Sequence, residues 1–63
     1  MTRKELDLLL DENDGELDFE DGFALTDYSG GRYRMYAPDQ EFGEGTVCGF
    51  NEALKFYNAH KHN

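Results

Sequence analysis

Residues 16–28 read Glu-Leu-Asp-Phe-Glu-Asp-Gly-Phe-Ala-Leu-Thr-Asp-Tyr, and this stretch decides the fold. In its first five residues, apolar and acidic side chains alternate strictly, which is the period-two pattern of a strand with one buried face. Asp21-Gly22 is a strong hairpin signal, so residues 23–28 are expected to return as a second strand. The stretch therefore predicts an antiparallel hairpin that buries Leu17 and Phe19 and leaves carboxylates on its other face.

Two further strands are expected after this hairpin. Residues 29–31, Ser-Gly-Gly, form the next turn, and residues 32–36, Arg-Tyr-Arg-Met-Tyr, have the alternation of a third strand. Residues 37–45 are polar and contain proline and glycine, which predicts a loop with Phe42 as its one apolar anchor. Residues 46–50 fit a short fourth strand, so the meander has three or four strands.

A helix is expected before the sheet. Thr2 followed by Glu5 is a capping-box pattern, and leucines at positions 6, 9 and 10 make one apolar stripe. Residues 13–15, Asn-Asp-Gly, tolerate the left-handed backbone of a helix exit, so the helix should end by residue 12.

A second helix is expected after the sheet. Asn51 is a good N-cap, and apolar side chains at positions 53, 54, 56 and 57 can cover one sheet face through residue 59. Residues 60–63, His-Lys-His-Asn, are expected to form a frayed basic tail. The predicted fold class is α+β: residues 1–63 form one small domain, in which a three- to four-stranded antiparallel β-meander is flanked by an N-terminal and a C-terminal helix.

The chain offers little apolar material for this fold. Only 13 of its 63 residues are Leu, Ile, Val or Phe, so the five Phe and four Tyr must supply much of the core. A core of this size gains stability from any additional buried area. A second copy of the chain, in a homodimer, is therefore one possible partner.

The cysteine content and the apolar runs bear on the compartment. Cys48 is the only cysteine and cannot form an internal disulfide, so we interpret it as a core residue in a reducing compartment. No run approaches the roughly 20 apolar residues that a membrane helix needs. The N-terminus also lacks the apolar segment of a signal peptide. The sequence predicts a cytoplasmic protein, in the host cytoplasm if the chain is viral.

The net charge of −8 lies entirely in the first half of the chain. Residues 1–31 contain ten acids and two bases, whereas residues 32–63 contain four of each. Such a charge disfavours direct binding to nucleic acid or to an anionic membrane and favours a cation or a basic protein surface. The candidate partner-binding residues are the eight acids between positions 11 and 27: Asp11, Glu12, Asp14, Glu16, Asp18, Glu20, Asp21 and Asp27.

The run from Asp11 to Asp21 resembles an EF-hand calcium loop, with a predicted helix before it, an acidic glycine turn and an apolar residue two positions after the glycine. The calcium loop needs 12 residues with oxygen ligands at fixed positions and glycine at position 6. With Gly15 at position 6, Leu10 takes the first ligand position and Asp21 takes the last, where the family has a bidentate glutamate. The resemblance implies degenerate calcium binding by residues 10–21 as an alternative function.

Catalytic patterns are weak. Cys48 with His60 or His62 could form a thiol–imidazole pair, but the chain offers no third group to orient the imidazole. The glycines suit turns and do not form a phosphate-binding G-x-G-x-x-G pattern. We therefore predict no enzymatic activity, no cofactor and no specific metal ligands.

Arg32 and Arg34 alternate with aromatic residues, as in proteins that bind single-stranded nucleic acid. Two arginines against a net charge of −8 are too few for that role. We expect them to lie with Tyr36 on the exposed face of the sheet and to pair across the hairpin with acids such as Asp27.

The acidic face of the first predicted strand gives the leading hypothesis for the function. On a strand that rises ~3.4 Å per residue, Glu16, Asp18 and Glu20 would stand about 6.8 Å apart, similar to the phosphates of a nucleic-acid backbone. In this respect the chain resembles the small acidic inhibitors that bacteriophages encode against restriction, CRISPR or transcription machinery. The leading hypothesis is an inhibitor that presents this face to a basic nucleic-acid-binding surface. The alternatives are a generic interaction module or accessory subunit without mimicry, and a solvated face that only keeps the domain soluble.

Overall fold

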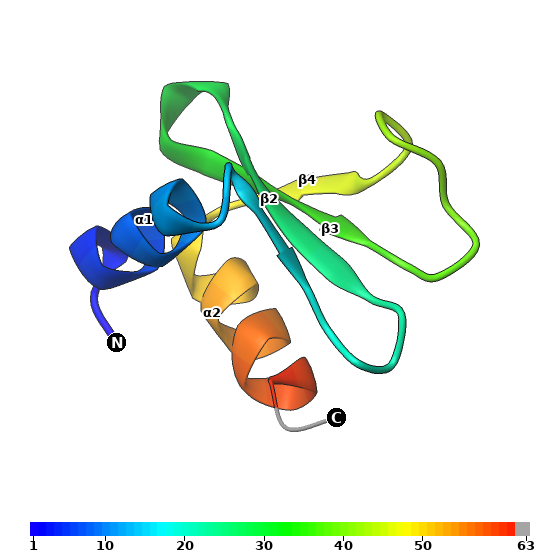
Figure 1. Cartoon of the computed structure of the whole chain (residues 1–63). Helices are drawn as coiled ribbons and strands as arrows, with labels where there is room; N and C mark the ends of the chain where they lie inside the picture. Colours follow the sequence, from blue (N-terminus) through cyan, green and yellow to red (C-terminus); the bar gives the residue numbers. More distant parts are fainter. Residues whose placement is uncertain (62–63) are drawn as a thin grey trace.

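The computed structural model describes residues 1–61, which form two helices and a four-stranded antiparallel sheet in strand order β1-β2-β3-β4 (Figure 1). This arrangement confirms the predicted α+β meander between two helices. The fourth strand is present but ends at Cys48, two residues before the predicted end, because Phe50 already belongs to the second helix. The elements are α1 (Arg3–Glu12), β1 (Glu16–Asp18), β2 (Ala24–Tyr28), the single 3-10 turn η1 (Ser29–Gly31), β3 (Arg32–Tyr36), β4 (Thr46–Cys48) and α2 (Phe50–His60).

Both helices cover the same face of the sheet, and the core lies between them and the strands (Figure 1). The register places Leu25 beside Met35 and Tyr33 beside Cys48, so alternate residues of three strands point toward the helices. The predicted inward positions of Leu17 and Phe19 are confirmed, since both side chains pack against this core. Its buried members are Leu6, Leu10, Leu25, Tyr33, Cys48 and Ala53.

The N-terminal helix begins and ends where the sequence predicts. The Thr2 hydroxyl accepts a hydrogen bond from the Glu5 backbone N–H, and the Glu5 carboxylate accepts one from the Thr2 N–H, which completes the capping box. Beyond Glu12 the chain reverses through Asp14 and Gly15, whose φ angles of 60° and 82° lie in the left-handed region. This reversal delivers the chain directly into β1.

The first hairpin differs from the prediction in length. Its loop has three residues, 20–22, because the Phe19 N–H donates to the Phe23 carbonyl at 2.9 Å and the Gly22 N–H donates to the Phe19 carbonyl at 3.1 Å. Gly22 has a φ of 91°, the left-handed position that a three-residue hairpin loop requires. The strand ends at Asp18, so the expectation that Glu20 extends its acidic face is wrong.

The outer face of the sheet is not fully exposed. Tyr36 is only 7% exposed and Thr26 only 9%, because the connection between β3 and β4 folds back over this face. The Tyr36 hydroxyl accepts a hydrogen bond from the Gly43 N–H at 3.0 Å, which holds the connection there. Phe42 is 88% exposed, so the expectation that it anchors this loop is wrong and Tyr36 serves that role.

The C-terminal helix begins two residues earlier than predicted, at Phe50, and ends one residue later, at His60. Gly49 is its N-cap without a side-chain hydrogen bond, and Asn51 lies inside the first turn, so the predicted Asn51 cap is wrong. His60 is the last helical residue, and its ring stacks on that of Phe23 with centroids 4.2 Å apart. The frayed tail predicted for residues 60–63 therefore does not include His60, while positions 62 and 63 lie outside the described residues. Within residues 1–61, neither helix has the length and apolar content needed to cross a bilayer.

Candidate functional site

The strand β1, which carries two of the predicted acidic residues, forms one edge of the sheet (Figure 1). The structure does not place all eight predicted side chains on one face. Asp11 and Glu12 lie in the last turn of α1, Asp14 in the reversal after it, Glu16 and Asp18 on β1, Glu20 and Asp21 in the hairpin loop, and Asp27 on β2. The edge formed by the first six of these residues, Asp11, Glu12, Asp14, Glu16, Asp18 and Glu20, is called the acidic edge below.

Asp27 does not belong to the acidic edge. The register pairs it with Tyr33, whose side chain points toward the helices, whereas Arg34 is paired with Thr26 on the outer face. Arg34 instead lies over the ring of Tyr28, with its guanidinium carbon 4.5 Å from the ring centroid. The expected pairing of the two arginines with Asp27 is therefore wrong, because strand alternation puts the partners on opposite faces.

Asp21 has a structural role. One of its oxygens accepts a hydrogen bond from the Phe23 N–H at 3.2 Å, and the other lies 2.5 Å from Nδ1 of His60. The carboxylate thus links the hairpin loop to the end of α2. Among residues 1–61 this is the one contact at ion-pair distance between a carboxylate and a basic side chain, so no Lys or Arg side chain of these residues pairs with the acidic edge.

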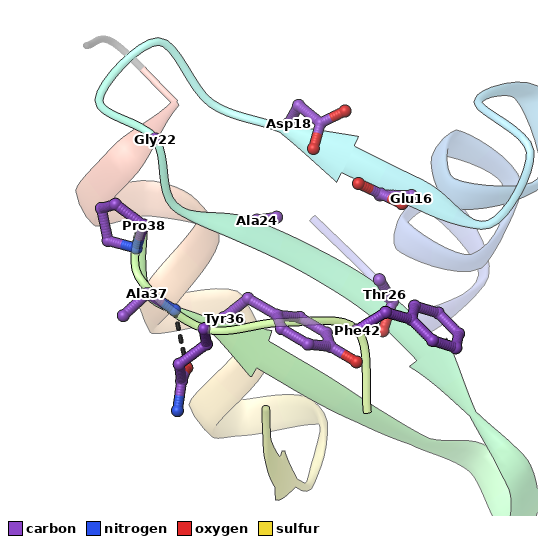
Figure 2. Close-up of a pocket in the computed structure, with 10 residues that line it drawn as sticks. Glu16, Asp18, Gly22, Ala24, Thr26, Tyr36, Ala37, Pro38 and Phe42 are labelled. Atoms are coloured by element: carbon purple, nitrogen blue, oxygen red, sulfur yellow. Dashed lines mark hydrogen bonds between the residues drawn. The ribbon is translucent and has the colours of Figure 1, made fainter. Parts of the chain in front are cut away.

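Glu16 and Asp18 lie side by side on the outer face of β1, with their carboxyl groups turned toward each other (Figure 2). A hydrogen bond with Asp18 raises the pKa of Glu16, and partial burial and the negative charge of Asp18 raise it further. A cation placed beside the two carboxyl groups would relieve the repulsion between their charges.

A groove runs along the outer face beside these two carboxylates (Figure 2). Its floor is formed by β2, where the register sets the small side chain of Ala24 between Asp18 and Tyr36. Glu16 and Asp18 form one side, and Tyr36 with the start of the following loop forms the other. The lining residues are Glu16, Asp18, Gly22, Ala24, Thr26, Tyr36, Ala37, Pro38, Gln40 and Phe42.

The two ends of the groove differ. At the hairpin end Gly22 faces Pro38 so closely that a Cβ on Gly22 would lie 3.1 Å from the proline ring. At the other end stands the exposed ring of Phe42 (Figure 2). The groove volume of about 210 Å³ is below the roughly 300–1,000 Å³ typical of small-molecule and cofactor sites. Its dimensions suit a single side chain of a protein partner better than a free ligand.

The hydroxyl of Tyr36 contributes to the polarity of this groove. Burial alone would raise its pKa, but the hydrogen bond from the Gly43 N–H and the nearby Arg34 guanidinium outweigh burial, and the pKa of Tyr36 is lowered. The groove therefore has an aromatic and hydrogen-bonded side opposite its acidic side.

The calcium-loop alternative finds no geometric support. After β1 the chain turns through a hairpin into β2, where an EF-hand would enter its second helix, and Asp21 contacts His60. Among residues 1–61, no three Asp, Glu, His or Cys side chains converge on a point where a metal ion could be held.

The thiol–imidazole pair is not assembled either. Cys48 is buried at the end of β4, shortly before α2, and burial, together with the nearby Glu52 carboxylate, raises the pKa of its thiol. His60 lies at the other end of that 11-residue helix, about 16 Å away at 1.5 Å per residue. Cys48 is therefore a core residue, as the sequence predicts, and His62 lies outside the described residues.

Comparisons of the chain with protein-family models, with curated proteins and with solved structures found no match. The function is therefore inferred from the chain's own residues.

Sequence reasoning identified the two acids of the groove but missed its other components. Ala24 carries a weak signal, since it is a small residue at an outward position of a strand, between larger ones. Nothing in the sequence indicates that residues 37–45 fold back over the sheet, because that depends on the hydrogen bond between Gly43 and Tyr36.

Proposed function

We propose that the protein is a small acidic inhibitor that binds a basic surface of a nucleic-acid-binding protein and competes there with nucleic acid. It would act in the cytoplasm, in the manner of the inhibitors that bacteriophages direct against restriction, CRISPR or transcription machinery. The partner is a basic protein surface, and the chain itself does not contact nucleic acid.

The observation that carries this proposal is that no Lys or Arg side chain of residues 1–61 pairs with the acidic edge. A domain that used its acids for its own stability would place Lys or Arg beside them, since opposite charges across strands and helix turns contribute to stability. Residues 5–31 contain no Lys or Arg at all. These negative charges can therefore attract a basic surface from a distance and pair with its Lys and Arg side chains on contact.

The arrangement of the edge supports competition with nucleic acid. The Cα atoms of Glu16 and Asp18 stand about 6.8 Å apart, from a rise of ~3.4 Å per residue, while their carboxyl groups turn toward each other and form a closer pair of charges (Figure 2). The other acids of the acidic edge lie in the helix end before β1 and in the hairpin loop after it, outside the face of the strand. A partner with several Lys or Arg side chains along a groove can thus contact several carboxylates at once.

Two charge-reversal variants with the same total charge test this proposal. The first changes three acids at the edge (Glu16→Lys, Asp18→Lys, Glu20→Lys), and the control changes three exposed acids elsewhere (Asp39→Lys, Glu41→Lys, Glu52→Lys). Each set changes the net charge from −8 to −2, since each reversal adds two units.

The tagged protein and both variants are used to capture partners from a lysate of the source, or of its host, in a series of salt concentrations. We expect the original and the control to retain the same nucleic-acid-binding protein at low salt and release it as salt rises. The edge variant should retain none while keeping its circular dichroism spectrum. Equal capture by the edge variant and the control would contradict the proposal.

A generic interaction module remains the second candidate, and the exposure of Phe42 favours it. Exposed aromatic residues are typical centres of protein–protein interfaces. Such a module would bind with little dependence on salt and would lose its partner on Phe42→Ala rather than on reversal of the acidic edge.

A further inference from the structure

We propose that the groove between β1 and the loop after β3 receives one arginine side chain of the protein partner. This inference rests on the proposed function, because it names the group of a basic partner that the outer face would recognise. Figure 2 shows the groove with its acidic side on β1 and its aromatic side on β3 and the following loop.

The groove exists because of a small residue in a row of larger ones. Across the sheet, Ala24 stands between Asp18 and Tyr36, so a hollow forms where a larger side chain would fill the space. Proline at one end and the aromatic ring of Tyr36 along one side provide apolar contact for the aliphatic stem of a long side chain.

Charge complementarity identifies the occupant as a cation. Glu16 and Asp18 turn their carboxyl groups toward each other at the side of the groove, and no Lys or Arg of residues 1–61 forms an ion pair with them. A cationic head group placed beside both would relieve their mutual repulsion. The cost of desolvating such a group is limited because the groove is open to solvent.

The side chains that line the groove favour arginine over lysine. A guanidinium group is planar and has five N–H donors in a fixed fork, so it can donate to two neighbouring carboxylates at once. Its flat faces can also stack on an aromatic ring, and the exposed ring of Phe42 stands at the open end of the groove. The ammonium group of lysine also has several donors, but it lacks the fixed planar fork and has no flat face to stack on a ring.

Defined peptides test this inference separately from the identity of the partner. The probe is acetyl-Gly-Gly-Arg-Gly-Gly-amide, compared with its lysine and citrulline counterparts, in amide NMR titrations of the isotopically labelled protein. We expect the arginine peptide to shift the resonances of Ala24, Thr26 and Phe42, the lysine peptide to bind more weakly, and the uncharged citrulline peptide not to bind.

Three variants locate the binding. Ala24→Leu fills the floor of the groove without a change of charge and should abolish binding of the arginine peptide. Phe42→Ala removes an exposed ring and should weaken binding roughly two- to fivefold. The control Leu8→Ala removes an exposed apolar side chain of α1 and should leave binding unchanged.

Binding of the arginine peptide that is equal in Ala24→Leu, in Phe42→Ala and in the original protein would overturn the inference. Equal affinity for the arginine and lysine peptides would overturn it too. The proposed function can fail independently. If the arginine peptide binds in the groove but reversal of the acidic edge leaves partner capture unchanged, the arginine site is supported and the proposed competition with nucleic acid is contradicted. If partner capture depends on the acidic edge but the Ala24→Leu variant captures the partner as well as the original protein does, the proposed function is supported and the arginine site is contradicted.

Discussion

Glu16 and Asp18 weaken the fold that carries them. The pKa of Glu16 is raised above its ordinary value of 4.5, first by its hydrogen bond with Asp18 and then by burial. A group with a raised pKa in the folded state stabilises the protein fully below its unfolded pKa and loses that contribution as the pH rises through the folded pKa. At neutral pH the repulsion between the two carboxylates is therefore present in the folded protein.

Replacing one of these acids should stabilise the protein at neutral pH. We expect Asp18→Asn to lower the pKa of Glu16 and to raise the thermal midpoint at pH 7, with a smaller difference from the original at pH 4, where Glu16 is largely protonated. Carboxyl-carbon NMR titration measures the pKa, and thermal unfolding by circular dichroism measures the midpoint. Asp39→Asn is the matched control, and a gain in midpoint equal to that of the control would contradict the assigned repulsion.

Tyr33 should be the last tyrosine to ionise. Burial, followed by its hydrogen bond to the Asp7 carboxylate and the negative charge of that group, raises the pKa of Tyr33 from 10.0 to about 12. Its contribution to stability is complete below pH 10 and is lost as the pH rises toward 12, because only the unfolded chain ionises readily in that range. Absorbance titration of the phenolates should show a late step that Tyr33→Phe removes. A titration without a late step in the original protein would contradict the buried position of Tyr33.

The strand residues show why the sequence was informative about the sheet. Alternation between apolar and polar side chains correctly predicts that Leu17, Tyr33 and Met35 point toward the helices, because a strand has a period of exactly two residues. The same rule would have excluded a contact between Asp27 and Arg34, which a count of opposite charges alone suggested. Strand geometry was thus a stronger constraint than charge.

At the scale of elements, the end of α2 is joined to the first hairpin. The ring of His60 stacks on Phe23 and lies 4.6 Å, centroid to centroid, from Phe56, while its Nδ1 contacts Asp21. This cluster closes the open end of the core, where β1 and β2 meet in their loop. The histidine therefore fixes the position of the helix end, which the sequence placed in a frayed tail.

Removal of this contact should destabilise the protein. We expect His60→Ala to cost about 1–2 kcal/mol of unfolding free energy, since it removes an aromatic contact and a hydrogen bond to a carboxylate. Urea unfolding followed by circular dichroism measures the change. Lys55→Ala, on the exposed side of the same helix, is the control. A loss no larger than that of the control would show that the end of α2 does not hold the hairpin.

The elements divide into those that local sequence determines and those that it does not. The capping box of Thr2 and Glu5 determines the start of α1, since both hydrogen bonds are made within four residues. The start of α2 is different, because the helix begins before Asn51 to bring Phe50 against the core. Tertiary packing overrode the intrinsic preference of a capping residue there.

At the scale of the whole molecule, the charge asymmetry bears on self-association. Pairing of two β1 edges would bring the Glu16 and Asp18 side chains of both copies together across the new strand pair, which like charges oppose. A homodimer, if formed, would use another surface, and its existence stays a prediction. The asymmetry thus favours a partner with the opposite charge over a second copy of the chain.

Competition with nucleic acid tests the central claim most directly. The captured partner is saturated with a fluorescently labelled nucleic acid that it binds, and release of the label is followed as the protein is added. We predict stoichiometric release that weakens as salt rises, unchanged release by the control with reversals at Asp39, Glu41 and Glu52, and none by the variant with reversals at Glu16, Asp18 and Glu20. Binding of the protein to its partner while the labelled nucleic acid stays bound would contradict the account.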